Sequence, residues 1–487
     1  FVFGDWSSDV CSSDLLRINE WLAASPNADD WFELFNPQNQ PVALGGLHLS
    51  DHPGDRTRFA IAPLSFLGAG ADARVVFVAD DNASRGPSHV NFKLNADGGY
   101  LGLYDAVGER LDAVSFGPQQ SQVSEGRFPD GSETVVAFAS SVSRGTANWL
   151  PLSNVVVNEV LAHTDPPWED AVEFHNPGDS PVPLGGWFLS NSEREPRRFR
   201  LPDGTILPAR GYLVLYEYQF NPPGSARAFT FNSARGDAAI LSAADAFGNL
   251  TGWRAFAEFG PSANGVSVGR HQTTVGVDFV PLTRPTFGVD APADVAQFRA
   301  GLGAANAAPL AGSVVLTELM FCPPPVIGTD DNTLDEFVEL FNTLAVAQPL
   351  YDPDAPTNTW RLSGAIDYRF PTQVTLAAAE HVLVVPFDPV TEPAVLAGFR
   401  VRYGVPDTVR LFGPWQGRLG NGGETVRLFQ PDPPQVAPHP DAGLVPYVLV
   451  ESVRYGVAAP WPAGTVATGL TLQRANEIGR ASCRERV

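Results

Sequence analysis

Cysteine, methionine and lysine are almost absent from this chain of 487 residues, which contains three, one and one of them. Two cysteines, Cys11 and Cys483, lie in terminal segments that we exclude below, so Cys322 has no partner for an intrachain disulfide. A single cysteine also excludes a multi-cysteine zinc site. We therefore expect the chain to fold without a disulfide or a zinc site of this kind, and Cys322 to act as a small apolar residue.

Basic residues are also few: 32 Lys and Arg stand against 54 Asp and Glu, which gives a formal net charge of −22. A surface this acidic repels polyphosphate and anionic lipid, so we predict no nucleic-acid binding and no membrane insertion by this part of the protein. Glycine and proline are frequent, and 44% of the residues are hydrophobic. This composition fits a folded, turn-rich β protein better than a disordered chain.

The two ends of the chain do not read as protein. Residues 5–15 are DWSSDVCSSDL and residues 477–487 are EIGRASCRERV. One codon choice for residues 12–15 has a reverse complement that translates as residues 477–480, as expected of one sequencing adapter read from both sides of an insert. We interpret residues 1–15 and 477–487 as adapter artefacts and exclude them. Because Met320 is the only methionine, we expect the remainder to be a fragment of a longer protein.

One sequence pattern occurs three times, in residues 18–51, 157–191 and 316–364. Its first piece, Ile-Asn-Glu or a close variant, is followed by an alternating apolar stretch that ends in Asn. The copies are spaced by the length of a whole domain, not of a solenoid repeat. We therefore predict three sandwiches, with a linker and a short helix between the second and third. Their predicted bounds are residues 16–147, 152–290 and 313–476, and the linker covers residues 291–312.

The predicted strands are short and are separated by Gly, Asp and Asn, without a helical period between them. This pattern is typical of an all-β sandwich. In the first copy, residues 31–35 alternate as a strand does, and we expect residues 42–50 to return beside it as a hairpin after the Asn36-Pro37 turn. Further strands are predicted at residues 74–79, 100–104 and 110–116. Helices are predicted at residues 293–302 and 392–403.

These motifs resemble the bacterial lamin-tail (LTD) domain, which is named for the Ig-like tail of nuclear lamins. The residues that carry the resemblance are 18–20, 31–37, 44–51, 92–94 and 126–131, then 157–160, 172–177, 184–191 and 268–270. The third copy departs most, with Thr317 in place of Asn and Thr343 in place of Pro. The resemblance implies tandem Ig-like β-sandwiches with short helical insertions, in an exported bacterial protein located outside the cell or at its surface. The chromatin binding linked to lamin tails is not carried over, because this chain lacks a basic face.

Two short motifs suggest chemistry but lack its structural context. Residues 265–269 match the G-x-S-x-G nucleophile elbow, with His271 nearby. That elbow needs a strand-to-helix turn, whereas this segment aligns with a strand of the first copy. Arg235-Gly236-Asp237 is an RGD tripeptide, and we interpret it as a hairpin turn equivalent to Gly-Gly turns in the other copies.

Acidic loops recur at the same place in each copy. They contain Asp29 and Asp30 in the first copy, Glu169 and Asp170 in the second, and Asp330, Asp331, Asp335 and Glu336 in the third. Clustered carboxylates bind Ca²⁺ in many proteins, and the third loop is the best candidate here. No loop has the D-x-D-x-D-G spacing, so solvated loop charges are the alternative.

A glutamate recurs in the second piece of each pattern, as Glu33, Glu173 and Glu339. We predict strand residues that are hydrogen-bonded near a sheet edge rather than catalytic acids, because strand parity identifies no second carboxylate.

The histidines occupy non-equivalent places, and tryptophans of sandwiches are usually in the core. We therefore predict no catalytic residue and no resident cofactor. The expected role is structural or adhesive, toward an extracellular protein or polysaccharide. The alternative is an accessory module, for polysaccharide binding or spacing, of a secreted hydrolase or kinase-like enzyme.

Overall fold

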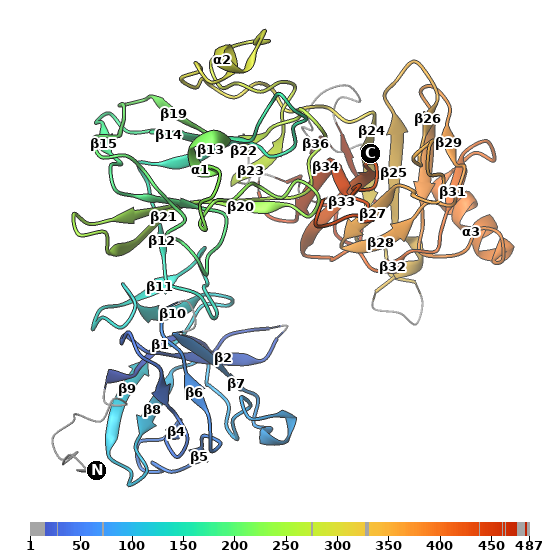
Figure 1. The fold of residues 1–487 in the computed structure, drawn as a ribbon. Helices are drawn as coiled ribbons and strands as arrows, with labels where there is room; N and C mark the ends of the chain where they lie inside the picture. Colours follow the sequence, from blue (N-terminus) through green and yellow to red (C-terminus); the bar gives the residue numbers. More distant parts are fainter. Residues whose placement is uncertain are drawn as a thin grey trace, which may run out of the picture.

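The structure is a computed structural model that describes residues 15–26, 28–70, 73–273, 276–326, 331–437, 439–459, 461–462 and 464–474 and the strand 483–484. Nearly all of the predicted adapter segments lie outside these residues. The regular structure of the described chain is mostly short strands, which form three pairs of larger sheets and three two-stranded sheets (Figure 1). The all-β fold class is therefore confirmed. Within the described residues, no helix has the length and apolar character needed to cross a bilayer.

The first sandwich contains eleven strands. They are β1 (Arg17–Leu22), β2 (Asp30–Phe35), β3 (Val42–Ala43), β4 (His48–Ser50), β5 (Phe59–Ala60), β6 (Phe66–Leu67), β7 (Arg74–Ala79), β8 (Gly99–Tyr104), β9 (Arg110–Phe116), β10 (Ser124–Arg127) and β11 (Val135–Phe138). One sheet has the order β11-β10-β1-β2-β7, the other has the order β5-β4-β8-β9, and β3 pairs with β6. The predicted strands at residues 74–79, 100–104 and 110–116 correspond to β7, β8 and β9.

The second sandwich repeats this topology. Its elements are β12 (Leu150–Pro151), β13 (Val156–Leu161), β14 (Ala171–His175), β15 (Val182–Pro183), β16 (Phe188–Ser190), β17 (Phe199–Arg200), β18 (Ile206–Leu207), β19 (Tyr212–Tyr216), α1 (Glu217–Phe220), β20 (Asp237–Ala244), β21 (Leu250–Phe259), β22 (Val268–Thr273), β23 (Gly276–Pro281) and α2 (Val295–Phe298). The sheets have the orders β23-β22-β13-β14-β19 and β17-β16-β20-β21-β12, with β15 paired to β18. The strand β12 comes from the linker and pairs with β21 in parallel.

The third sandwich has the same core order with added strands at the edges. Its elements are β24 (Val314–Met320), β25 (Phe337–Asn342), β26 (Gln348–Pro349), β27 (Arg361–Gly364), β28 (Ile366–Arg369), β29 (Thr375–Leu376), β30 (His381–Val384), α3 (Pro393–Tyr403), β31 (Arg410–Phe412), β32 (Gln416–Gly417), β33 (Gly423–Pro431), β34 (Tyr447–Gly456), β35 (Leu472–Arg474) and β36 (Cys483–Arg484). The sheets run β36-β35-β24-β25-β30-β31 and β32-β28-β27-β33-β34, with β26 paired to β29. Figure 1 shows the first and second sandwiches in line and the third beside the second.

The predicted hairpin between residues 31–35 and 42–50 is wrong. β2 pairs with β1 and β7, whereas β3 pairs with β6 and β4 lies in the opposite sheet beside β5 and β8. The physical reason is the burial pattern: Val42, Leu44, Leu47 and Leu49 are all buried, so this segment crosses the core instead of following one sheet. Gly46, at φ +87°, permits the bend between β3 and β4.

The predicted helices exist, although one is much shorter than expected. α3 covers residues 393–403, and its Phe399 packs against Met320 and Phe337 on the outer face of a sheet. α2 is limited to Val295–Phe298 and not residues 293–302, with Asp294 accepting a hydrogen bond from the Gln297 amide at its N-terminus. A single turn has little intrinsic stability, so α2 depends on burial of Phe298 against the corresponding sheet of the second sandwich.

The Asn that ends the repeated apolar stretch has the same role in each sandwich. Asn36, Asn176 and Asn342 are buried, and each donates hydrogen bonds through Nδ2 to backbone carbonyls of the following loop and of a loop about 32–35 residues later. An unpaired buried carbonyl costs free energy, so the amide stabilises the crossing between the sheets. This explains why the pattern retains Asn where the next residue changes from Pro to Thr in the third copy.

Candidate functional site: the buried glutamate pairs

Each sandwich contains a β-bulge at the same point of the repeated pattern. The register between β1 and β2 shifts between Ile18 and Glu20, that between β13 and β14 shifts between Val157 and Glu159, and that between β24 and β25 shifts between Leu316 and Glu318. A bulge puts two residues opposite one, so consecutive side chains can face the same partner strand. Here the bulge orients both residues of the Asn-Glu or Thr-Glu dipeptide toward one glutamate.

The bulge creates a pair of carboxylates in each sandwich. Glu20 lies directly opposite Glu33, Glu159 opposite Glu173 and Glu318 opposite Glu339. The second carboxylate was missed in the sequence analysis because simple alternation does not predict which residue faces Glu33. The recurring Glu of the first piece was the available signal. The predicted location near a sheet edge is wrong, since β2, β14 and β25 are interior strands.

Protein donors occupy the first pair completely. Glu33 accepts hydrogen bonds from the Asn19 amide and from the Gly145 backbone N–H, both at 2.9 Å. Glu20 accepts from the Ser124 hydroxyl at 2.5 Å and from both the backbone N–H and the hydroxyl of Ser143, at 3.1 and 2.8 Å. Both glutamates are fully buried. No face of either carboxylate is left for a substrate.

The second pair is bound in the same way. Glu173 accepts from Asn158 Nδ2 at 2.5 Å and from the Ala304 backbone N–H at 3.1 Å. Glu159 accepts from the Thr286 backbone N–H at 2.9 Å and from its hydroxyl. Gly145 and Ala304 belong to the two segments that lead into the next sandwich. Each of these two glutamate pairs therefore binds the linker that follows its own domain.

The third pair differs because no linker covers it in the described residues. Glu339 accepts from the Thr317 hydroxyl at 2.6 Å and lies 3.1 Å from Nδ1 of His381. Glu318 accepts from the Thr471 hydroxyl at 2.5 Å. The Glu339 side chain keeps about 20% of its surface exposed, whereas Glu33 and Glu173 have none.

Burial dominates the electrostatics of these pairs. Burial and, second to it, the neighbouring Glu20 carboxylate raise the pKa of Glu33 to about 8, while the hydrogen bond from Asn19 opposes the shift. Burial likewise raises the pKa of Glu173 to about 8 against the Asn158 hydrogen bond. Two adjacent carboxylates in a dry site favour protonation of one of them. The raised pKa values indicate that these carboxyl groups hold protons near neutral pH. Because the groups are fully buried, a substrate cannot reach them.

Linker asparagines complete the arrangement. Asn148 donates through Nδ2 to the carbonyls of Arg127 and Asn19, at 2.8 and 3.2 Å. Its counterpart Asn306 donates to the carbonyls of Arg270 and Asn158, at 2.9 and 3.0 Å. The glycine before each arginine is required, because a Cβ on Gly126 would lie 2.5 Å from the Asn19 carbonyl oxygen.

The acidic loops place their carboxylates against separate partners. Asp29 pairs with Arg85 at 2.7 Å, and Glu169 makes a bidentate pair with Arg299 at 2.6 Å. In the third loop Asp331 contacts Arg418, Asp335 contacts Arg402 and Asn332, and Glu336 is buried and accepts from the Leu419 backbone N–H at 2.9 Å. Across the described residues no three His, Cys, Asp or Glu side chains are grouped to hold a metal. Asp330 lies outside these residues, so Ca²⁺ binding at this loop stays a prediction.

The RGD tripeptide is a turn that is built into the fold. Gly236 has φ +83°, and a Cβ there would lie 2.3 Å from the Phe259 carbonyl oxygen. The Asp237 carboxylate accepts from Asn191 and from the Asn232 backbone N–H, at 2.8 and 3.0 Å. Arg235 pairs with Asp441 of the third sandwich at 2.7 Å. Both charged groups are thus engaged within the chain, which supports the turn interpretation over an adhesion ligand.

The G-x-S-x-G segment lies at the start of a strand. Ser267 is fully buried directly before β22, which pairs with β13 and β23, and no helix follows it. His271 lies within the same strand, opposite Asp278. The strand-to-helix turn that exposes a nucleophile is therefore absent from this part of the structure.

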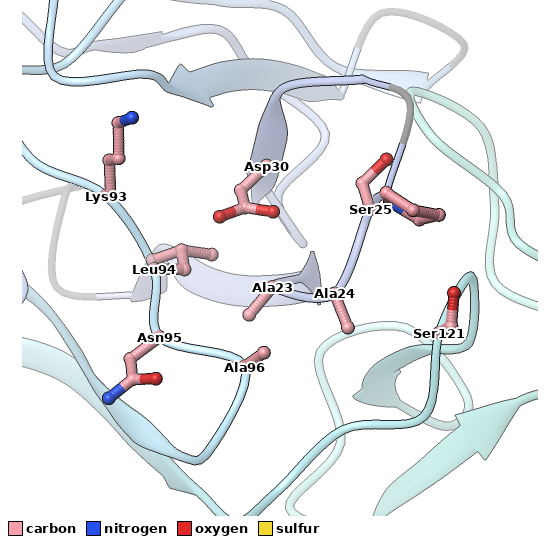
Figure 2. Close-up of a pocket in the computed structure, with 10 residues that line it drawn as sticks. Ala23, Ala24, Ser25, Asp30, Lys93, Leu94, Asn95, Ala96 and Ser121 are labelled. Carbon is pink, nitrogen blue, oxygen red and sulfur yellow. The ribbon is translucent and has the colours of Figure 1, made fainter. Parts of the chain in front are cut away.

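A shallow hollow of about 600 Å³ lies at one end of the first sandwich (Figure 2). Figure 2 shows the Asp30 carboxylate with Lys93 on one side and Ser25 on the other, and with the small side chains Ala23 and Ala24 below it. Burial raises the pKa of Asp30, while a hydrogen bond from the Ser25 backbone and the charge of Lys93 oppose the shift. One carboxylate without a second acid, a nucleophile or a metal site gives this hollow no evident chemistry.

Comparison with known proteins finds one family model that matches two segments of the chain. Residues 12–118 and 151–255 match the family described as Lamin Tail Domain. No curated protein and no solved structure matches the chain at a significant level. The two matched segments contain the first and second glutamate pairs, and the family is an Ig-like, non-catalytic one.

Proposed function

We propose that all three sandwiches are lamin-tail domains that arose by tandem duplication in a bacterial protein. The third sandwich lies outside the matched segments. It nevertheless has the same central strand order as the other two, the same bulge after Leu316 and the same opposed glutamates, Glu318 and Glu339. Independent domains rarely share both a topology and an irregularity at an equivalent place, because bulges are specific to families.

We further propose that the chain is a non-catalytic structural region outside the cell, which holds its domains at fixed positions. The location and the bacterial source are based on the family resemblance. The structural role is based on the buried glutamates, whose polar atoms are used to bind the linkers. It is also supported by the size of the sandwiches, each of which has its own core of more than 20 buried residues.

The observation that carries this proposal is the linker between the first and second sandwiches. Its N-terminal part is hydrogen-bonded to the first sandwich through Gly145 and Asn148. Only two residues later, β12 pairs with β21 of the second sandwich, with Leu150 opposite Trp253. A linker that is bonded to both neighbours has little freedom to bend, unlike a flexible Gly/Ser segment.

Direct contacts between the sandwiches support the same interpretation. The Phe128 and Trp253 rings meet edge to face at 5.3 Å across the first junction. At the second junction, Asp441 accepts from Asn232 at 3.0 Å and pairs with Arg235, while Arg454 pairs with Asp278 at 2.6 Å. Exposed ion pairs contribute little individually, so these contacts set orientation more than affinity.

Asn148→Ala is expected to loosen the first junction. The substitution leaves the buried carbonyls of Arg127 and Asn19 without their shared donor, a loss of about 2 kcal/mol. Spin labels at Val107 and Phe247, which are highly exposed in the first and second sandwiches, would report the distance between them once Cys11 and Cys483 are replaced by serine. We expect one narrow distance distribution in the parent chain and a width at least twofold larger in the variant.

The control is Asn91→Ala, which removes an exposed amide of the first sandwich that donates only to the Arg58 carbonyl. It should leave the distance distribution unchanged. A broad distribution in the parent chain would contradict the proposal of a fixed spacer, whatever the variants show.

A second candidate function is that of an accessory module that binds polysaccharide for an enzyme encoded beyond this segment. It is favoured by Trp253, which keeps 41% of its surface exposed, whereas the other tryptophans of the described residues are buried or half-buried. Exposed aromatic rings pack against the apolar faces of sugars. Retention of the chain on a glycan column, lost in Trp253→Ala, is the expected result if this candidate is correct.

A further inference from the structure

A groove of about 1050 Å³ lies at the junction of the first and second sandwiches. Its walls come from three places: the turn after β2, the linker at residues 145–148, and the loops of the second sandwich at residues 193–198 and 226–227. Its base includes Ser242 of β20 and Arg254 of β21. The groove exists only when both sandwiches are held together, so it depends on the fixed linker described above.

The groove is basic although the chain is strongly acidic. Six arginines and three carboxylates line it: Arg74, Arg194, Arg197, Arg198, Arg227 and Arg254, with Asp130, Glu193 and Glu195. Arg74 is paired with Asp130, and Arg198 with Glu195. The exposed arginines Arg194, Arg197 and Arg227 make no ion pair with any carboxylate of the described residues. They leave a local excess of positive charge in a chain whose formal net charge is −22.

Two polar atoms at the base of the groove lack hydrogen-bond partners. Arg254 is only 2% exposed, yet its Nη1 has no acceptor, and the nearest carboxylate, Glu193, is 3.7 Å away. The buried Ser242 hydroxyl also has no partner. The two residues are directly opposite in the β20–β21 ladder, so their side chains leave the same face of the sheet.

Unpaired buried donors are uncommon in folded proteins, because each costs the free energy of its lost hydration. Both atoms are buried, so the Arg254 guanidinium acts on the groove through its positive charge rather than through direct contact. Burial also lowers the pKa of Arg254, and an anion in the groove would offset that destabilisation of its charged form. The arrangement therefore fits an anionic group better than a neutral one.

Trp253 adds an aromatic surface to the same groove. It lines the groove, and its ring is held by the edge-to-face contact with Phe128 at 5.3 Å. A glycine with φ +85° precedes it, and a Cβ on that Gly252 would lie 2.5 Å from the Phe128 ring. Tryptophan and arginine together provide a stacking surface and charge-assisted donors within one groove.

From these observations we propose that the groove binds an acidic polysaccharide, in which carboxylate groups are carried on sugar rings. The sugar rings pack on the exposed Trp253, and their carboxylates pair with the exposed Arg194, Arg197 and Arg227, while the buried Arg254 adds positive charge at the base of the groove. This inference rests on the second candidate function and specifies its ligand class. The structural spacer role does not depend on it.

The test uses the full chain and two tetrasaccharides of equal length, a tetragalacturonate and a neutral cellotetraose, with binding measured by titration calorimetry at low and moderate salt. We expect the acidic oligosaccharide to bind in preference to the neutral one, and its affinity to fall with salt. The double variant Arg197→Gln/Arg227→Gln should bind at least about tenfold more weakly, since each loses a charge-assisted hydrogen bond. Both residues are exposed, so the fold should persist.

The matched control is Arg210→Gln, an exposed arginine of the second sandwich that pairs with Asp179 outside the groove. It should bind as the parent does. Equal binding of the neutral oligosaccharide, tighter binding of a single-stranded oligonucleotide or polyphosphate, or unchanged affinity in the double variant would each overturn the proposal. Absence of binding to either tetrasaccharide would overturn it too. Binding of cellotetraose alone, abolished by Trp253→Ala, would preserve polysaccharide binding as a function while rejecting the acidic class.

Discussion

Glu173→Ala is expected to lower the free energy of unfolding of the second sandwich by about 3 kcal/mol. The substitution leaves the partly buried Ala304 backbone N–H without an acceptor and leaves the buried Asn158 amide with only Asn306 Oδ1, and each lost hydrogen bond to a charged acceptor costs about 1–3 kcal/mol. Removal of a buried carboxylate recovers part of this loss, because Glu173 itself is costly to desolvate. Calorimetry of the intact chain would measure the shift of the transition that belongs to the second sandwich.

The matched control is Glu339→Ala, the same change at the equivalent position of the third sandwich. Glu339 is partly exposed and binds no linker, so its loss should cost about 1 kcal/mol or less. Similar effects at both positions would contradict the view that the linker makes these glutamates important. A loss below about 1 kcal/mol at Glu173 would show that water replaces the carboxylate at little cost.

The second large effect is a decrease in stability as the pH rises. The pKa values of four carboxyl groups are raised to about 8, and burial is the largest cause in each case. The four groups are Glu33, Asp170, Glu173 and Glu336. Their ordinary values are 4.5 for Glu and 3.8 for Asp. Between these values and pH 8 the folded chain binds more protons than the unfolded chain, so the free energy of unfolding falls with rising pH.

The expected slope is about 1.4 kcal/mol per pH unit for each such proton, and it should level off above pH 8. The chain is therefore expected to be more stable at pH 5.5 than at pH 8.5 by several kcal/mol, measured by urea unfolding at a series of pH values. Glu173→Gln removes one titrating group. The free energy of unfolding of the second sandwich should then depend less steeply on pH, by about 1.4 kcal/mol per pH unit. Stability that increases from pH 5.5 to 8.5 would show that these carboxyl groups are ionised and well compensated in the folded state.

Much of the fold could be predicted from the sequence, because strands and turns leave patterns among residues that are neighbours along the chain. Strand alternation and glycine turns gave the all-β class and located β7, β8 and β9. The helix α3 was also predicted, over residues 392–403. The hairpin after Asn36 was wrong because pairing depends on which sheet a segment joins. Val42 and Leu44 are buried by contacts from elsewhere in the chain, and alternation within the segment does not reveal them.

The candidate site was predicted only in part. The recurrence of Glu33 and Glu173 marked them as important, but their partners depend on the bulge after Ile18 and Val157, which shifts the register by one residue. The acidic loops were visible as carboxylate clusters, while the arginines that pair with them lie far away in sequence, as for Glu169 and Arg299. Charge composition likewise predicted an acidic surface without indicating the basic groove.

The sequence by itself determined the repeated pattern, the strand periodicity and the residue types at each position of the three copies. Only the tertiary structure decided what those residues do. Glu20 binds Ser143, which is 123 residues away, and the groove unites side chains of two sandwiches. The physical reason is that hydrogen bonding and burial act over a few ångströms in space, whereas sequence patterns report only on neighbours along the chain. Glu33 and Glu173 bind the linkers because folding brings backbone N–H groups of the linkers within hydrogen-bond distance of their carboxylates.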